Sequence, residues 1–146
     1  MVRAARDRVS APFVRGDATA LPIATGSVDA VAFVSTLEFI PNIDTVLAEA
    51  TRVLAADGTL VALVLNTRSE YVQSNLEREG SYFQRMVHGN SDTVTETVLE
   101  HVDGEREFFL GISEDDVFES TTPTTAALSA IVGPRVSDHN ILARVR

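Results

Sequence analysis

Two apolar runs on either side of an amphipathic helix constrain the fold more than any other feature of this sequence. Val28–Val34 and Thr59–Leu65 are nearly continuous in apolar residues, which is typical of parallel strands covered on both faces. Between them, Ile43–Ala56 carries an apolar stripe at helical spacing, made of Val46, Leu47, Ala50, Val53 and Leu54. A strand, a helix and a strand in this order predict a βαβ unit, and therefore an α/β fold.

Length and composition set the class of the molecule. With 146 residues, the chain is long enough for one domain with a core and too short for two ordinary domains. It contains no cysteine, so neither disulfides nor thiolate metal sites are expected. No apolar run reaches the roughly 18 residues that cross a membrane, and no apolar stretch of a secretory signal follows the first residues. We expect a cytoplasmic protein without a membrane span.

The charge of the chain excludes one class of partner. It carries 21 acidic and 12 basic residues, for a net charge of -9, and every basic residue is arginine. Such a surface repels phosphate backbones, so nucleic acid is not expected as a partner. An acidic, lysine-free composition suits a salt-loving organism, because salt screens the self-repulsion of the charges. GC-biased codon usage explains it as well, and the salt dependence of folding would separate the two explanations.

Shorter signals flank the βαβ unit. Val2–Val9 has a helical pattern, and Phe13–Gly16 predicts a short strand that ends at Asp17. Ser69–His88 is compatible with one helix interrupted at Gly80 or with two shorter helices. Further on, the patterns predict a helix over Val94–Val102, a strand over Glu105–Ile112, a short helix capped by Ser113 and Asp116, a helix over Thr122–Val132 and a closing strand over His139–Arg146.

The stretch Phe13–Pro22 carries the family signal. Gly16-Asp17-Ala18 and Leu21-Pro22, followed by the strand Val28–Val34, resemble the class I S-adenosylmethionine-dependent methyltransferases, nearest the ubiquinone/menaquinone type. The resemblance implies a Rossmann-like α/β sheet in the order 3-2-1-4-5-7-6, with flanking helices and with Phe13–Gly16 as strand 3. The family's glycine-rich loop would precede this segment, and the sequence lacks it. We therefore expect residues 1–146 to be a single partial domain, with the equivalents of strands 3 to 7, from a longer parent chain.

The resemblance also assigns candidate cofactor residues. Asp17 and Ala18 would hold the adenine of S-adenosylmethionine, the carboxylate accepting from the exocyclic amine and the alanine N–H donating to the ring. Backbone groups of Val34 and Ser35 would flank the methionine moiety. Taken by itself, Asp17 has a plainer interpretation, in which it ends a strand and satisfies N–H groups of a turn.

Catalytic residues are harder to assign, because methyl transfer needs little beyond alignment of the reacting atoms. Glu38 stands where many relatives have histidine. It is a candidate base if burial raises its pKa, and otherwise a first-turn or surface residue. Asn66-Thr67-Arg68 is either a substrate contact or a solvated loop. Four residues form either a lid over an apolar acceptor or part of the core: Tyr71, Tyr82, Phe83 and Met86.

No metal site is expected. His88, His101 and His139 lie far apart in the sequence without ligand spacing. Glu114-Asp115-Asp116 lacks the glycine and the alternating pattern of a cation loop, and a helix N-terminus explains its charge more simply.

These features together predict a methyltransferase that uses S-adenosylmethionine to methylate a small-molecule acceptor, with activity only as part of the longer parent chain. The alternative is a non-catalytic module derived from the same fold, which binds a partner or forms a homo-oligomer. A third interpretation is an α/β domain that binds another nucleotide in the cleft at Asp17. The sequence identifies neither the acceptor nor the atom that is methylated.

Overall fold

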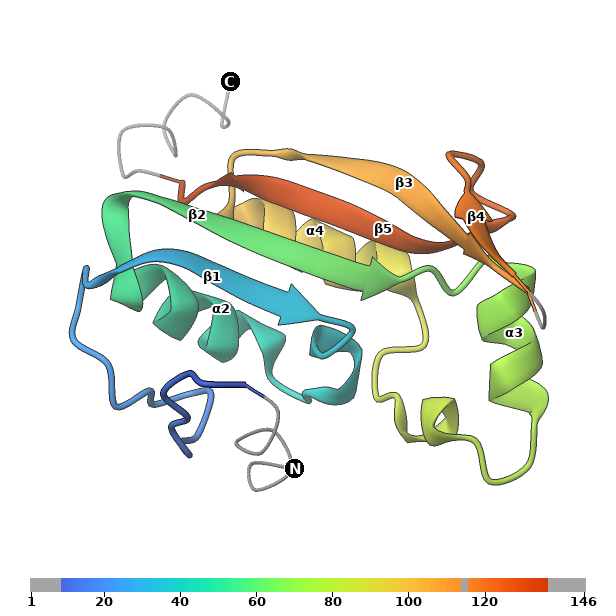
Figure 1. The fold of residues 1–146 in the computed structure, drawn as a ribbon, viewed down its shortest axis with the longest axis horizontal. Helices are drawn as coiled ribbons and strands as arrows, with labels where there is room; N and C mark the ends of the chain where they lie inside the picture. Colours follow the sequence, from blue (N-terminus) through green and yellow to red (C-terminus); the bar gives the residue numbers. More distant parts are fainter. Residues whose placement is uncertain (1–8, 114–115, 137–146) are drawn as a thin grey trace.

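The chain forms one mixed sheet with helices packed mainly on one face, as Figure 1 shows for this computed structural model. The structure describes residues 9–113 and 116–136. In these residues the five strands lie in the order β1-β2-β5-β3-β4. The strands are β1 (Val28–Val34), β2 (Leu54–Leu65), β3 (Glu105–Ile112), β4 (Val117–Glu119) and β5 (Ala126–Pro134). The helices are η1 (Leu37–Phe39), α2 (Ile43–Val53), α3 (Glu70–Glu77), η2 (Tyr82–Arg85) and α4 (Ser91–His101).

The predicted βαβ unit is confirmed. β1 has the predicted bounds and pairs parallel to β2, with Val31 opposite Leu60. Asn42 caps α2 by accepting a hydrogen bond from the N–H of Thr45. The stripe residues Val46, Leu47, Ala50 and Val53 are buried on α2. The helix was predicted to continue to Ala56, but it ends at Val53, and Leu54, which is also buried, begins β2. Helix and strands therefore arise from the periodicity of one contiguous segment, and α2 crosses over between two parallel neighbours.

The antiparallel half contains the main correction. The helix predicted over Thr122–Val132 is instead strand β5, which pairs antiparallel with both β2 and β3. Thr122 does begin a helical turn, because its carbonyl accepts from the N–H groups of Thr125 and Ala126, but the turn ends there. Two open strand edges supply hydrogen bonds on both sides of β5, and such tertiary pairing overrides local helix propensity. β5 takes the place of the closing strand predicted at 139–146, which lies outside the described residues.

β1, β2, β5 and β3 thereby lie in the order expected for strands 4, 5, 7 and 6. The predicted strand over Glu105–Ile112 is confirmed as β3, and the helix expected around Val94–Val102 is confirmed as α4. The short helix expected at Ser113 is wrong. The hydroxyl of Ser113 does accept from the N–H of Asp116 (3.1 Å), but this bond closes the hairpin between β3 and β4. Glu114 and Asp115 lie outside the described residues.

The predicted strand Phe13–Gly16 does not form. This stretch has no strand assignment, and the next residues make a tight turn, in which Asp17 bridges to Ala20. A strand needs a neighbour to satisfy its N–H and C=O groups. In the described part of the chain β1 is bonded to β2 alone, so β1 is the edge of the sheet. The helix expected over Val2–Val9 lies outside the described residues except for Val9.

Residues 69–88 adopt the second of the two predicted arrangements. α3 ends at Glu77, and η2 follows after a break at Gly80, whose φ is 73°. Glycine reaches this left-handed region without the steric cost that a side chain imposes. The two short helices therefore sit at an angle set by the turn between them.

α2 and α4 lie against the same face of the sheet (Figure 1) and enclose the core with it. On the opposite face, two rows of apolar side chains cross three strands, and we call this surface the open face. The rows are Ala32, Val61 and Val132, and Val34, Leu63 and Ala130. All six are partly or largely exposed, with Val34 at 60% and Val132 at 51%. The expectation that Val28–Val34 is covered on both faces is therefore wrong.

No helix in the described ranges is both long and apolar enough to cross a membrane.

Candidate functional site

The site is built at the carboxyl ends of the parallel strands β1 and β2. β1 stops at Ser35, whose φ of 44° is uncommon for a residue other than glycine. The N–H of Ser35 donates to the carbonyl of Leu63 (2.8 Å), and the hydroxyl of Thr36 donates to the carbonyl of Val34 (2.8 Å). These bonds turn the chain sharply from β1 into η1. The turn brings Ser35 beside Leu65, the last residue of β2, on the wall of a shared cavity.

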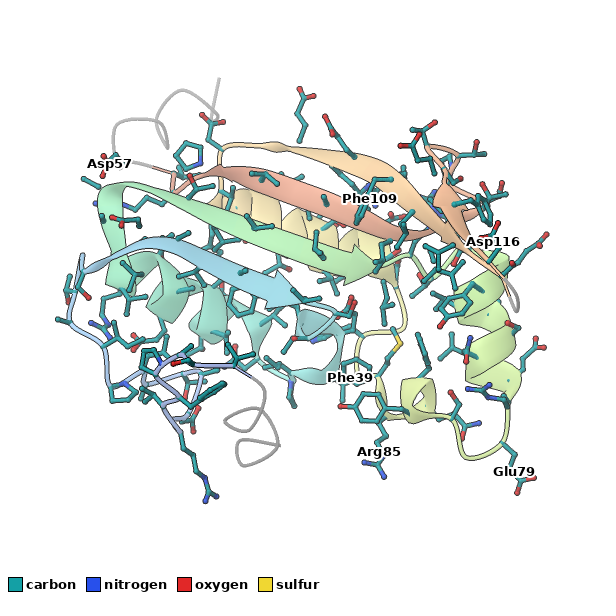
Figure 2. All side chains as sticks on the ribbon, viewed as in Figure 1. Phe39, Asp57, Glu79, Arg85, Phe109 and Asp116 are labelled. Atoms are coloured by element: carbon teal, nitrogen blue, oxygen red, sulfur yellow. The ribbon has the colours of Figure 1, made fainter. Side chains whose placement is uncertain are left out.

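The cavity has a volume of about 340 Å³ and an apolar wall. Its lining comes from six elements and from Ser35: Phe39 of η1, Leu65 of β2, Tyr71 of α3, Tyr82 and Phe83 of η2, Ile112 of β3 and Leu128 of β5. Phe39 lies on the side of η1 towards η2 (Figure 2), with its ring centroid 4.7 Å from that of Tyr82. Tyr71 meets Phe83 edge to face at 6.0 Å. Such aromatic pairs prefer this geometry and give the wall a definite shape.

Of the predicted lid residues, Tyr71, Tyr82 and Phe83 line the cavity. Met86 does not; it ends η2, where its N–H donates to the carbonyl of Phe83. Sequence analysis missed Phe39, Leu65, Ile112 and Leu128, which line the same cavity. Leu128 could not be found from the sequence, because its segment was predicted as a helix and only the pairing of β5 with β2 places it beside Leu65.

Glu38 is fully buried beneath this site. Its Oε1 accepts a hydrogen bond from the N–H of Leu65, and among the described residues Oε2 has no partner. The carbonyl of Glu38 accepts from the N–H groups of Val87 (2.9 Å) and His88 (3.2 Å), so the residue joins η1, the end of β2 and the segment after η2. Burial raises the pKa of Glu38, while the Leu65 N–H and His88 lower it. Glu38 is not one of the cavity-lining residues. The side chain of Glu38 thus connects η1 to the end of β2, and its role as a base stays a prediction.

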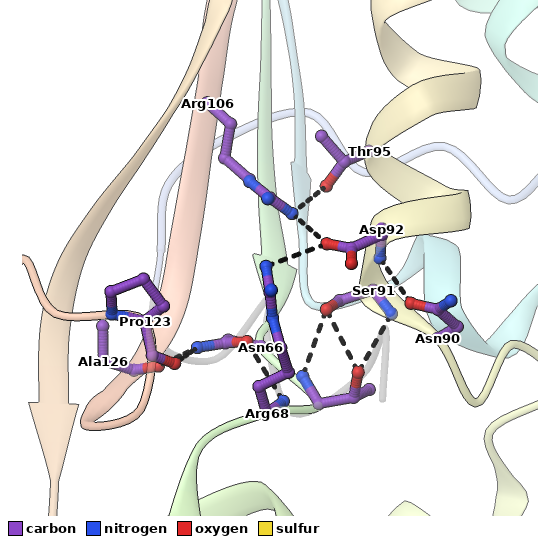
Figure 3. Close-up of polar contacts among 10 residues, drawn as sticks. Asn66, Arg68, Asn90, Ser91, Asp92, Thr95, Arg106, Pro123 and Ala126 are labelled. Carbon is purple, nitrogen blue, oxygen red and sulfur yellow. Dashed lines mark hydrogen bonds and ion pairs between the residues drawn. The ribbon is translucent and has the colours of Figure 1, made fainter.

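The loop after β2 is buried at its first two residues and exposed at Arg68. Asn66 and Thr67 are buried, with exposures of 1% and 6%. The Asn66 amide donates to the carbonyls of Pro123 and Ala126, and the hydroxyl of Thr67 exchanges hydrogen bonds with Ser91. Figure 3 shows this network at the end of β2.

The charged part of the network involves two arginines. Arg68 and Arg106 both pair with Asp92 at the start of α4, at 3.1 and 2.6 Å (Figure 3). The Arg106 bond, assisted by the charge of Arg68, lowers the pKa of Asp92. Arg68 is therefore engaged as a cross-link between β2 and α4.

The predicted adenine residues lie in the turn before β1. Asp17 is exposed, and its Oδ1 accepts from the N–H (2.9 Å) and the hydroxyl (2.7 Å) of Thr19. These two donors lower the pKa of Asp17, so the group is a carboxylate at neutral pH. Ala18 is half-buried against the core. In this structure Asp17 thus satisfies donors of a turn, as the plainer interpretation of the sequence expects.

No three metal-binding side chains come together anywhere in residues 9–113 and 116–136. His88 contacts the carbonyl of Ile40 (2.8 Å), and His101 pairs with Asp44 (2.8 Å). His139 lies outside the described residues.

The sequence matches a known family over part of its length, and the structure is similar to solved structures of methyltransferases. Residues 1–62 match the family described as methyltransferase domain. A "SAM-dependent methyltransferase, possible histamine N-methyltransferase" from Thermotoga maritima superimposes with a TM-score of 0.73 and 20% identity, over 93% of this chain and 69% of that chain. The chain has the fold of S-adenosylmethionine-dependent methyltransferases. The likeness to these methyltransferases is one of fold, and the family match covers the first 62 residues.

Two further methyltransferase structures are similar. One is the putative methyltransferase in a complex with the Trm112 methyltransferase activator of Haloferax volcanii, with a TM-score of 0.68 and 20% identity over 95% of this chain and 68% of that chain. The other is a SAM-dependent methyltransferase from Archaeoglobus fulgidus, with a TM-score of 0.61 and 17% identity over 83% and 66%. No curated protein matches the chain.

Proposed function

We propose that this protein transfers a methyl group from S-adenosylmethionine to a small-molecule acceptor whose reacting end lies in the apolar cavity. The position of the cavity is the observation that supports this most directly. Ser35, which directly follows β1, and Leu65, the last residue of β2, both line it. In open α/β sheets, ligands bind in the crevice outside the carboxyl ends of the strands.

The residues at this end of the molecule fit the cofactor. Asp17 is an exposed carboxylate, which is the acceptor that an exocyclic amine requires, and Ala18 is small enough for backbone to approach a ring. Near β1, the carbonyl of Val34 keeps a second lone pair beside its bond to Thr36, and Ser35 borders the cavity. Asp17 and Ala18 would hold the adenine, and Val34 and Ser35 the methionine end.

When bound, S-adenosylmethionine supplies a methyl group on a positively charged sulfur. The protein's part is to align the acceptor and keep water away, which is how a bimolecular displacement gains most from an enzyme. The cavity wall suits this part because it is apolar and shaped by two aromatic pairs. Glu38, whose carboxyl is buried against Leu65, is not needed as a base when the acceptor's proton is released to solvent.

The lining of the cavity also supports an acceptor class. A lining of aromatic and aliphatic side chains fits a flat apolar ring better than a charged group. We therefore propose a ring-shaped apolar acceptor.

Calorimetric titration with S-adenosylhomocysteine tests the cofactor site. We expect saturable binding by the protein and a loss of at least about tenfold in Asp17→Ala, because a charged acceptor for the amine is removed. Asp29→Ala is the matched control, since Asp29 is an exposed carboxylate on β1. Equal affinity of the Asp17 variant and the protein would refute the adenine role, and a folded protein that binds no S-adenosylhomocysteine would refute the function.

A further inference from the structure

The segment that follows the proposed adenine residues is held by side chains of α2. Glu49 Oε1 accepts from the N–H of Leu21 (2.7 Å). Arg52 Nη2 donates to the carbonyls of Ile23 (2.9 Å) and Leu21 (3.3 Å), and Nη1 donates to the hydroxyl of Thr25 (2.9 Å). One acidic and one basic side chain thus satisfy both donors and acceptors of the loop from Leu21 to Thr25.

The two side chains also hold each other. Arg52 Nε lies 2.7 Å from Glu49 Oε2, and Nη2 lies 2.8 Å from Oε1, which is the paired geometry that suits a guanidinium and a carboxylate. The Arg52 hydrogen bonds lower the pKa of Glu49 to about 2, so the pair stays charged across the range in which proteins fold. A surface pair at this spacing ordinarily stabilises a protein little. This pair differs because both of its members continue to loop atoms.

No helix or strand is assigned from Leu21 to Thr25, and directly after this loop the N–H groups of Gly26 and Ser27 donate to the carbonyls of Arg52 and Val53. Phe13–Gly16 forms no strand, and the turn at Asp17 is closed by its own bonds, from Ala20 N–H to the Asp17 carbonyl and from Thr19 to the carboxylate. Ala18 touches the core. The position of this turn on the molecule therefore depends on the packing of Ala18 and on the anchor that begins at Leu21.

We propose that Glu49 and Arg52 are positioning residues for S-adenosylmethionine. They hold the loop against α2, so that Asp17 and Ala18 meet the adenine in a fixed orientation. This inference rests on the proposed function, because it assumes that Asp17 and Ala18 bind the adenine. It predicts that changing either residue weakens the binding of the adenosine half of the cofactor, beyond any loss in the free energy of unfolding.

The experiment compares variants of the same helix by calorimetry with S-adenosylhomocysteine and with adenosine. Arg52→Lys keeps the charge but cannot reach the loop carbonyls, Thr25 and Glu49 together, so we expect at least about a fivefold loss for both ligands. Glu49→Gln keeps an acceptor for Leu21 and should lose less. The control is Asp44→Asn, which breaks the α2 ion pair with His101 and has no contact with the loop. It should bind both ligands within about twofold of the protein, since exposed pairs contribute little.

Urea unfolding of each variant gives the folded fraction, and Thr25→Val supplies a milder change at a single loop contact, with an expected loss of about twofold. Affinities that fall in Arg52→Lys and Glu49→Gln, but not in Asp44→Asn, support the proposal. Unchanged affinities in the loop variants, or an equal fall in Asp44→Asn, overturn it and leave the proposed function intact. A folded protein that binds neither ligand overturns both.

Discussion

At the scale of single residues, Glu38 is a buried polar residue that connects two elements of the fold. Its carboxyl is fully buried, with one oxygen on the N–H of Leu65 and the other without a partner in the described part of the chain. Burying a charge with a single hydrogen bond is costly, which is why burial raises its pKa. The hydrogen bond to Leu65 connects η1 to the end of β2, directly under the cavity.

This connection leads to a prediction about stability. Glu38→Gln keeps an acceptor for Leu65, so we expect the free energy of unfolding at pH 7 to change by less than about 1 kcal/mol. Glu38→Ala leaves the Leu65 N–H unpaired beside a void, and should cost about 2 to 4 kcal/mol. Urea unfolding monitored by circular dichroism measures both. Equal stability of the alanine variant and the protein would show that the connection is dispensable.

The same variant separates the pH dependence of Glu38 from that of other carboxyls. A raised pKa means that the folded state holds the proton more tightly, so its contribution is present below the ordinary glutamate pKa. That contribution is lost as the pH rises through the raised value. Relative to Glu38→Gln, the protein should therefore lose free energy of unfolding as the pH rises from the ordinary glutamate pKa through the raised pKa of Glu38. Asp17, Glu49 and Asp92, whose pKa values are lowered, act in the opposite direction and cancel in the difference.

At the scale of elements, the turn at Gly80 sets how η2 meets α3, and so where Tyr82 and Phe83 lie in the cavity wall. Gly80 has a φ of 73°, and a side chain there would meet no atom within 4 Å. Gly89 has equally open space, without a left-handed backbone. The two glycines thus form a matched pair in which backbone conformation is the difference.

We expect Gly80→Ala to lower the free energy of unfolding by about 1 kcal/mol, because alanine is strained at this φ. Gly89→Ala should be neutral or stabilising by up to about 1 kcal/mol, because it restricts the unfolded chain. Thermal unfolding of both variants checks this. The prediction fails if the two variants destabilise the protein to the same extent.

At the scale of the whole molecule, the sheet is covered unequally. α2 and α4 bury one side, whereas the open face exposes two apolar rows across β1, β2 and β5 (Figure 1). Exposed apolar surface of this kind is a liability in water and commonly marks a place that another group covers. Its rows follow directly from the register, since opposed residues of paired strands point to the same side.

The open face predicts binding of a hydrophobic dye to the folded protein. We expect anilinonaphthalene sulfonate fluorescence in native buffer, and a fall of roughly half when Val61 and Val132 are both changed to threonine. Val117→Thr is the control, because Val117 is 61% exposed but lies on β4, away from the rows. Near-ultraviolet circular dichroism must show native packing in each variant. A folded protein that binds no dye would contradict the exposure of this face.

Much of the fold was determined by the sequence alone where the signal is local. β1, α2, β2, α4 and β3 each follow from apolar periodicity within one contiguous segment, and α2 has its capping residue next to it. Tyr71, Tyr82 and Phe83 were named from the sequence as either a lid or part of the core, and in the structure they line the cavity. Asp17 and Ala18 were singled out by a motif, and their role stays a prediction.

Only the tertiary structure decided the features that depend on distant partners. Thr122–Val132 has a helical pattern, but two unpaired strand edges, of β2 and β3, make it a strand and place Leu128 in the cavity. Phe13–Gly16 has a strand pattern, but no strand is assigned there and β1 pairs with β2 alone among the described strands. In the sequence, Glu49 and Arg52 have only the spacing of an ordinary helix ion pair. Their hydrogen bonds to the loop at Leu21 and Ile23 are visible only in the structure. Backbone hydrogen bonds between segments far apart in the chain carry no local signature, so the sequence pattern could not reveal them.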